Sequence, residues 1–247
     1  MTSEAAASGH MTPILFAGDP HRNFSPILRA CAVSPPGSLI LLGDCECDAP
    51  LPQMLAPAME AGWDVRWILG NRDTDSVRVF DNLVVAYPQG DIGGRVVEIG
   101  GVRIAGLSGV FKPRVWHPIE CEPPQFRTRA AFLAALPEKE HWRGGLPLWH
   151  RDTIFPEDFA SLRGQAFDVL VTHEAPSSHR HGFAVIDDLA AQGGARWIVH
   201  GHHHEPYQAT LANGIRVRGL GVAECWAGCL VASGCSSPGP SVSAQAR

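Results

Sequence analysis

Residues 39–44 read Leu-Ile-Leu-Leu-Gly-Asp, an apolar run of strand length that ends in a glycine and an aspartate. A continuous apolar run is typical of a strand that is buried on both faces of its sheet. Helices are expected on either side of it, over residues 26–33 and 51–62, and the second one ends at a glycine. A strand between two helices predicts parallel pairing within an α/β domain.

The same pattern extends along the chain in both directions. Further apolar runs of strand length occupy residues 14–17, 65–69, 83–87, 96–99, 102–107, 169–172 and 197–200. Another helix is expected over 185–192. Short turns at Gly100-Gly101 and at 212–214 predict two β-hairpins, over 96–107 and 208–218.

Composition narrows the class of protein. The chain has 247 residues, of which 45% are hydrophobic and 18% charged, as in an ordinary globular protein. A net charge of −5 argues against binding to nucleic acid through the overall field. No apolar run approaches the roughly 20 residues that a membrane span needs, and the N-terminus lacks a signal-peptide pattern. The expectation is a cytoplasmic protein without a membrane partner.

The folded domain is expected to cover residues 12–235. Residues 1–11 are expected to be disordered or left over from cloning, and 236–247 to form a flexible tail. Residues 109–167 contain no clear strand but hold three of the seven tryptophans, which predicts either a lid over a site or a helical insert packed on the sheet. The seven cysteines are interpreted as reduced thiols, and the role of Cys225, Cys229 and Cys235 is left open.

Side chains that bind metals stand just beyond the ends of the predicted strands. In open α/β sheets reactive residues gather at the carboxyl ends of the strands. The side chains there are carboxylates, an amide and imidazoles, which suit Mn²⁺, Fe or Zn²⁺; they belong to Asp19, His21, Asp44, Asn71, His173, His202 and His204. The sequence therefore predicts a metal centre.

In their order, these fragments resemble the motifs of the calcineurin-like metallophosphoesterase superfamily. Those motifs read D-x-H, G-D, G-N-H-[DE], H and G-H-x-H, and the matching segments here are GDPH, LLGD, LGNRD, VTHEAP and GHHH. The resemblance spans about residues 14 to 220. It implies a four-layer αββα sandwich of the metallo-dependent phosphatase type, with two metal ions at the carboxyl edges of the strands.

The resemblance also implies a role for each metal ligand. Asp19, His21 and His204 would hold one ion, Asn71, His173 and His202 would hold the other, and Asp44 would bridge the two. The ions would be Mn, Fe, Zn or a mixture, with Mn favoured. The implied activity is hydrolysis of a phosphodiester or nucleotide by in-line attack of a metal-bridging hydroxide. A phosphomonoesterase or nucleoside-polyphosphate hydrolase is the enzymatic alternative, and a non-catalytic scaffold is the alternative from another class.

One position departs from the family pattern, because Arg72 stands where the motif has histidine. An arginine stays charged and cannot act as a general acid, so Arg72 is predicted to supply charge but no proton to the reaction. Substrates with good leaving groups should then be favoured. Asp73 is predicted either to orient a catalytic neighbour or to cap its own turn. Candidate substrate contacts are Arg72, His200, His179 and His181, although a buried structural role is the favoured interpretation for His200.

The composition of residues 109–167 bears on the class of substrate. This segment carries seven basic and five acidic side chains between residues 112 and 152, a mixture that suits a nucleotide but is too weakly charged for long nucleic acid. A tryptophan could stack on the base, with Trp116, Trp142 and Trp149 as candidates. Residues 101–112 are also similar to a stretch of the RNA lariat debranching enzymes, which usually carry Cys where this chain has Asp19. The oligomeric state is left open.

Overall fold

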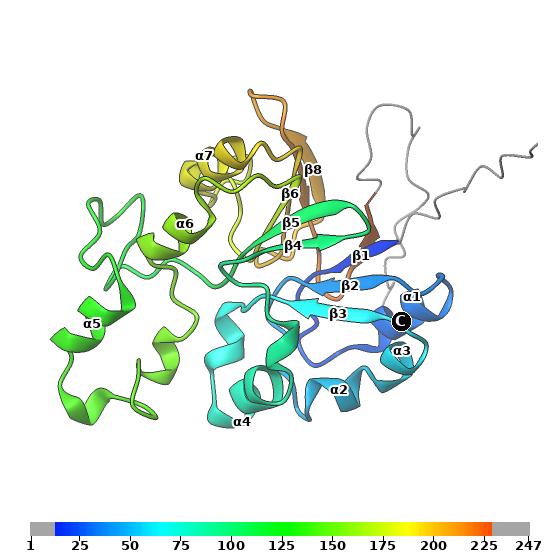
Figure 1. Ribbon diagram of the computed structural model, residues 1–247, viewed down its shortest axis with the longest axis horizontal. Coiled ribbons are helices and arrows are strands. Elements are labelled where there is room, and N and C mark those ends of the chain that lie inside the picture. The colour runs from blue at the N-terminus through cyan, green and yellow to red at the C-terminus, as the bar shows by residue number, and fades with distance from the viewer. Residues whose placement is uncertain (1–12, 229–247) are drawn as a thin grey trace, which may run out of the picture.

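The computed structural model describes residues 13–228, which form two β-sheets with helices on their outer faces (Figure 1). The first sheet has the order β10-β1-β2-β3. Its strands are β1 (Ile14–Ala17), β2 (Ser38–Leu41), β3 (Asp64–Trp67) and β10 (Cys225–Ala227). The first three run parallel, and β10 pairs antiparallel with β1.

The second sheet has six strands in the order β4-β5-β6-β7-β9-β8. They are β4 (Val96–Ile99), β5 (Val102–Leu107), β6 (Val169–Thr172), β7 (Trp197–His200), β9 (Arg216–Gly219) and β8 (Tyr207–Thr210). The four central strands are parallel, while β4 and β8 pair antiparallel at the two edges. Both predicted hairpins are therefore confirmed.

Helices cover the outer face of each sheet. The first sheet packs against α1 (Ser25–Ala32), α2 (Leu51–Met54) and α3 (Ala56–Glu60), with α4 (Val77–Phe80) following the 3-10 turn η1 (Asn71–Thr74). The second sheet packs against α5 (Arg129–Ala135), α6 (Pro156–Leu162) and α7 (Ala184–Gly193). The remaining turns are η2 (Asp81–Val85), η3 (Pro88–Gly90), η4 (Glu138–Glu140) and η5 (Leu148–His150).

Three apolar layers separate the four layers of backbone. Alternate residues of a strand face opposite sides of its sheet, so Leu39 and Leu41 of β2 pack under the helices whereas Ile40 packs between the sheets. Ile40 shares that central layer with Ile104 and Val171 of the second sheet. The apolar run at 39–42 is continuous because both faces of β2 are buried, and the predicted αββα sandwich is confirmed.

Two local predictions differ from the structure. The strand predicted at 83–87 is wrong, because this segment lies in the wide helical turn η2, in which the Ala86 amide donates to the Asp81 carbonyl (2.9 Å). Leu83 and Tyr87 are buried while Val85 is 59% exposed, a helical rather than an alternating pattern. The helix expected over 51–62 is divided at Leu55, since Pro57 has no amide hydrogen with which to continue it.

The segment between β5 and β6, residues 109–167, holds α5, α6, η4 and η5 and is called the insert below. In Figure 1 the insert is green and extends past the carboxyl end of β3, with α5 at the edge of the molecule. Its turn η5 contacts η1. Nowhere in residues 13–228 is there a helix long and apolar enough to cross a bilayer. The expectations for residues 1–11, the 236–247 tail, Cys229 and Cys235 lie outside the described part.

Candidate metal centre

The seven predicted metal ligands meet at the carboxyl ends of the strands. Ligand atoms of Asp19, His21, Asp44 and His204 lie within 4.8 Å of one another, and so do those of Asp44, His173 and His202. Asp44 belongs to both groups. The Asn71 side chain joins the second group, with Oδ1 3.2 Å from His173 Nε2. The fold thus brings together residues that are up to 185 positions apart in the chain.

The loops that carry these ligands have an unusual backbone. Positive φ angles occur at Asp19 (37°), His21 (43°), Asp44 (51°), His202 (72°) and His204 (57°). Residues other than glycine adopt this region at a cost of order 1–3 kcal/mol each, and such strain is concentrated at functional sites. The positive φ angles are therefore better explained by the need to direct the predicted metal ligands toward one point than by a contribution to stability.

Two glycines let the carboxylates approach the backbone. A Cβ on Gly70 would lie 2.3 Å from Asp44 Oδ1, and one on Gly201 would lie 2.6 Å from Asp19 Oδ2. The amide of His202 then donates to both oxygens of Asp19 at 3.0 Å. Any side chain at either glycine would displace a carboxylate from the centre.

In the first group, two imidazoles converge on one point. His21 Nε2 and His204 Nε2 are 2.8 Å apart, and His21 Nδ1 lies 2.7 Å from Glu46 Oε1. When the Nδ1–H of His21 donates a hydrogen bond to the Glu46 carboxylate, Nε2 is left with a lone pair, and it lies 3.9 Å from Asp44 Oδ2. This arrangement, in which a carboxylate orients a histidine, is the usual support for a metal-binding imidazole.

The second group shows the same feature inside the protein. His173 Nδ1 donates to the Leu42 carbonyl oxygen (2.7 Å), so its Nε2 is unprotonated, and burial lowers the His173 pKa to about 4. That Nε2 faces Asn71 Oδ1 at 3.2 Å and Asp44 Oδ1 at 3.4 Å. Three acceptor lone pairs directed at one another are unfavourable unless a cation lies between them. The residues present therefore fit a divalent metal ion.

The pKa values of the two buried carboxyl groups, Asp19 and Asp44, also favour a bound cation. Burial is the main reason that the pKa of Asp44 rises to about 6 and that the pKa of Asp19 rises well above its ordinary value. The neighbouring carboxylates of Asp44 and Asp73 raise the Asp19 pKa further. The backbone amide of Arg72 opposes the rise of the Asp44 pKa by donating to Asp44 Oδ1 at 2.8 Å. A nearby cation would favour the ionised form of both acids.

Arg72 and Asp73 occupy different environments. The side chain of Arg72 is 50% exposed, with Nε 3.1 Å from Asp75 Oδ2. Asp73 is fully buried and accepts from the backbone amides of Gly70 (2.9 Å) and Glu46 (3.0 Å). Burial raises the Asp73 pKa to about 7. Asp73 thus joins the loop after β2 to the loop after β3, whereas Arg72 extends toward solvent.

Glu46 was not singled out from the sequence. It is 9% exposed, and besides His21 it contacts the guanidinium of Arg22, with Oε2 3.2 Å from Nε, while its Oε1 lies 3.8 Å from Arg72 Nε. It lies between Cys45 and Cys47, which are both fully buried. In the sequence, the one available signal was an acidic residue between two cysteines. Its partners are too distant in sequence to be identified by spacing.

The predicted histidine contacts to substrate differ in accessibility. His200 is 1% exposed, with Nε2 2.8 Å from the Tyr207 hydroxyl and Nδ1 2.9 Å from the Gly201 carbonyl, so it is held inside the fold. His179 is buried and stacks on His203, with ring centroids 4.0 Å apart. His181 is exposed beside that pair. Of the three predicted contacts, His181 is the one that solvent reaches freely.

Comparison with known proteins agrees with this geometry. The chain belongs to the calcineurin-like phosphoesterase family, whose model matches residues 12–206. The family supports a phosphoester hydrolase, and the residues gathered at the carboxyl ends of the strands could hold a divalent metal ion.

Among individual proteins, the chain is similar to an uncharacterized protein of Haemophilus influenzae. The two are 39% identical over 195 residues, which are 78% of this chain and 84% of that protein. Two solved structures share the fold: TT1561 of Thermus thermophilus (TM-score 0.54, 11% identity, 87% of this chain and 93% of that one) and phosphopantetheinyl hydrolase from Mycobacterium tuberculosis (TM-score 0.53, 18% identity, 87% and 91%). At these identities the likeness concerns the fold alone.

Proposed function

We propose that the protein is a dinuclear-metal phosphoesterase that hydrolyses a phosphodiester or a nucleotide. The observation that carries this proposal is the position of Asp44, which is shared by two groups of ligand atoms. The first ion would be held by Asp19, His21, Asp44 and His204, and the second by Asp44, Asn71, His173 and His202. This mixture of carboxylate, amide and imidazole suits Mn²⁺, which we favour, as well as Fe and Zn²⁺.

When bound, two such ions supply an activated water and positive charge for in-line displacement at phosphorus. The chain's own residues have supporting roles. Asp44 would offset the repulsion between the cations, and the neutral imidazoles would leave net positive charge for the phosphate. Asp73 would hold the loops of Asp44 and Asn71 together. Glu46 would keep His21 in the tautomer that binds a metal.

We assign to Arg72 the role of binding the phosphate group of the substrate. Its guanidinium extends from the same turn as Asn71 and is half exposed, so it can donate to a non-bridging oxygen of a substrate at the centre. Because it keeps its proton, it cannot assist a poor leaving group. We expect Arg72→His to increase turnover of alkyl-leaving esters relative to p-nitrophenyl esters. The same ratio of rates in both proteins would contradict this role for Arg72.

A nucleotide is supported by the environment of Trp149. Trp116 is buried against Phe111, and Trp142 packs against two guanidinium groups, whereas Trp149 is 55% exposed. Trp149 lies on η5, which contacts the η1 turn that begins at Asn71. The Lys112 ammonium donates to the Trp149 carbonyl oxygen and pairs with Asp152 at 2.6 Å, which anchors this turn. A free indole beside the centre is suited to stack on a base.

The first test is hydrolysis of bis(p-nitrophenyl) phosphate by metal-stripped protein before and after addition of Mn²⁺. Asp44→Asn should abolish Mn²⁺-dependent turnover, because the substitution removes the shared carboxylate. Asp48→Asn is the matched control, since Asp48 lies in the same loop but its side chain is 44% exposed and pairs with Arg78. Equal activity of Asp44→Asn and the control would exclude this centre as the catalyst.

The alternatives give different results in the same assay. A phosphomonoesterase would hydrolyse p-nitrophenyl phosphate faster than the diester, and a nucleoside-polyphosphate hydrolase would release phosphate or pyrophosphate from a nucleotide. A non-catalytic scaffold would bind two equivalents of Mn²⁺ by calorimetry yet hydrolyse none of these substrates. The proposal requires both the metal binding and the diester or nucleotide turnover.

A further inference from the structure

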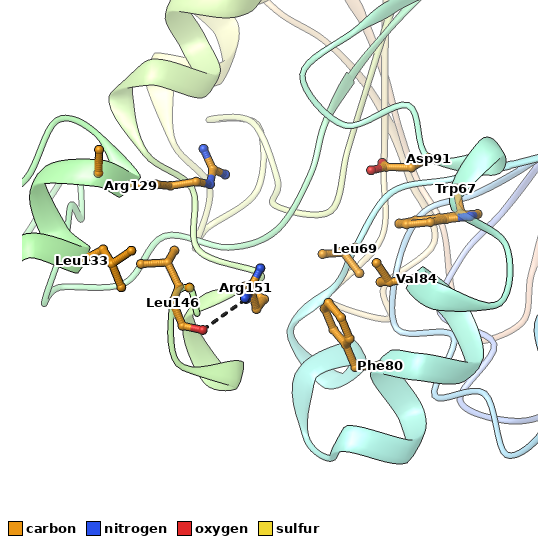
Figure 2. Close-up of a pocket in the computed structure, with 11 residues that line it drawn as sticks. Trp67, Leu69, Phe80, Val84, Asp91, Arg129, Leu133, Leu146 and Arg151 are labelled. Atoms are coloured by element: carbon orange, nitrogen blue, oxygen red, sulfur yellow. Dashed lines mark hydrogen bonds between the residues drawn. The ribbon is translucent and has the colours of Figure 1, made fainter. Parts of the chain in front are cut away.

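A cavity separate from the metal-ligating residues lies between the insert and the helical layer of the first sheet (Figure 2). It measures about 390 Å³, and a neighbouring cavity of about 310 Å³ shares four of its lining residues: Leu69, Asp91, Arg129 and Arg151. Pockets that bind small molecules typically measure about 300–1,000 Å³. The two cavities together are therefore large enough for a small organic ligand.

Two contacts hold the walls of the cavity in place. Arg143 of the insert pairs with Asp81, with Nη2 2.8 Å from Oδ2. The Trp142 ring meets the Phe80 ring edge to face, with centroids 5.3 Å apart. These contacts dock the insert on the α4 side of the molecule, so the cavity is part of the packed structure and not a gap beside a loose loop.

The walls present apolar surface from both sides. Trp67, Leu69, Phe80 and Val84 line one wall, while Leu133 and Leu146 line the other (Figure 2). Trp67 Nε1 donates to the Tyr87 carbonyl oxygen at 2.9 Å, so the polar atom of this indole already has its partner. The walls thus suit an aromatic or aliphatic body.

Arg151 supplies a fixed positive charge at this apolar surface. Its Nε donates to the Leu146 carbonyl oxygen and its Nη2 to that of Trp142, both at 3.1 Å. No carboxylate oxygen of residues 13–228 lies within 4.0 Å of its guanidinium nitrogens. Burial and the nearby Arg143 lower the Arg151 pKa. The guanidinium also lies over the Trp142 ring, 5.3 Å from its centroid, but no negative charge offsets its own, so an anionic group is a favourable partner for it.

Arg129, the second arginine that lines the cavity, does have carboxylate partners. Arg129 makes a two-pronged ion pair with Asp158, at 2.7 and 2.9 Å, and contacts Glu157 at 3.1 Å. Its charge is already neutralised. Asp91 faces the same cavity, with Arg95 3.8 Å away, and would repel a second negative charge on a ligand. The cavity therefore favours one acidic group over two.

We propose that this cavity binds a small amphipathic monoanion, with an aromatic or aliphatic body against Trp67 and Phe80 and a single acidic group on Arg151. The site is distinct from the metal centre, because none of the predicted metal ligands lines it. The acidic group is a carboxylate, a sulfonate or a phosphate diester, since each presents oxygens that a guanidinium can bind.

The test compares two fluorescent probes with the same type of aromatic body. 1-Anilinonaphthalene-8-sulfonate carries one negative charge, and N-phenyl-1-naphthylamine is its neutral counterpart. In the full-length protein we expect saturable binding of the sulfonate at one equivalent. Arg151→Met should weaken sulfonate binding about tenfold or more, the loss expected for a charge-assisted hydrogen bond, and should change binding of the neutral probe less than about twofold.

Two further variants define the site. Ala130→Trp, on an exposed position of α5 that lines the cavity, should weaken both probes by filling the space. Asp44→Asn, in the metal centre, should weaken neither. The proposal is overturned if the sulfonate fails to bind, if it binds Arg151→Met or Ala130→Trp as tightly as the unaltered protein, or if Asp44→Asn removes its binding. Equal loss of both probes in Arg151→Met would overturn the assignment of the charge to Arg151.

Discussion

Glu46→Gln tests whether the buried acid next to the centre controls metal binding. The side chain of Glu46 is 11% exposed, and its carboxylate lies 2.7 Å from His21 Nδ1. The substitution keeps the size of the side chain and its acceptor oxygen but removes the negative charge. The Nδ1–H of His21 then donates to an amide oxygen, so the Nε2 of His21 becomes a less basic ligand.

The expected loss follows from the type of hydrogen bond. Hydrogen bonds to charged groups contribute about 1.5–3 kcal/mol and neutral ones about 0.5–1.5 kcal/mol, so the variant loses about 1–1.5 kcal/mol. That difference corresponds to about tenfold weaker metal binding, at the lower end of the 10–100-fold range for residues that orient a metal ligand. A second effect is expected on Arg22, whose Nε lies 3.2 Å from the same carboxylate.

Calorimetric titration of metal-stripped protein with Mn²⁺ measures this loss without requiring activity. Asp48→Asn is the control, because it removes one negative charge from the same loop, and Asp48 pairs with Arg78 instead of contacting His21. Metal affinity of Glu46→Gln within about twofold of the unaltered protein, or an equal loss in the control, would refute the role assigned to Glu46.

Four further results are expected. Asp73→Ala removes the acceptor of two buried backbone amides and should lower the free energy of unfolding in urea by about 2–4 kcal/mol; a loss below about 1 kcal/mol would contradict this. Burial and two nearby cations lower the His150 pKa to about 4, so the unfolded chain binds the extra proton and stability falls as pH decreases from about 6.5 to 4. His150→Gln should remove at most about 2 kcal/mol of that decrease, measured by urea unfolding at pH 7 and 4.5. Chelation should lower the melting temperature by about 5–10 °C relative to protein with Mn²⁺ at 100 times its dissociation constant, and a change below 2 °C would argue against a structural contribution of the metal. Trp149→Ala should raise KM for a nucleotide about tenfold with little change in kcat, while leaving KM for bis(p-nitrophenyl) phosphate unchanged.

The strands and the candidate ligand motifs could be predicted from the sequence because each motif directly follows its strand. Parallel strands place their carboxyl ends at one edge of a sheet, so the residues after β1 and β2 converge in the first sheet and those after β6 and β7 in the second. The packing of the two sheets then brings both edges to one site. The segment at 83–87 was misread because its β-branched residues favour a strand locally. Tertiary contacts decide otherwise, burying Leu83 and Tyr87 on one side of a helical turn.

The histidines and tryptophans were harder to assign, since residue type does not report burial. In the sequence, Trp116 and Trp149 are equally good candidates to stack on a base of the substrate, yet packing buries Trp116 and leaves Trp149 55% exposed. His200 ends a strand, a position that fits either a substrate contact or the favoured structural role, and its burial and the hydrogen bond of its Nε2 with the Tyr207 hydroxyl agree with the structural role. The burial and the partners of these side chains depend on tertiary contacts, which the local spacing of residues in the sequence does not reveal.

The sequence by itself determined the αββα class and the set of seven candidate metal ligands, because both follow from short-range patterns of apolar runs and the polar residues after them. Tertiary structure alone decided that Glu46 supports His21, that Trp149 is free, and that Arg151 faces an apolar cavity without a counter-ion. The physical reason is distance along the chain: the partners of Glu46 and the walls around Arg151 come from segments that only packing brings into contact.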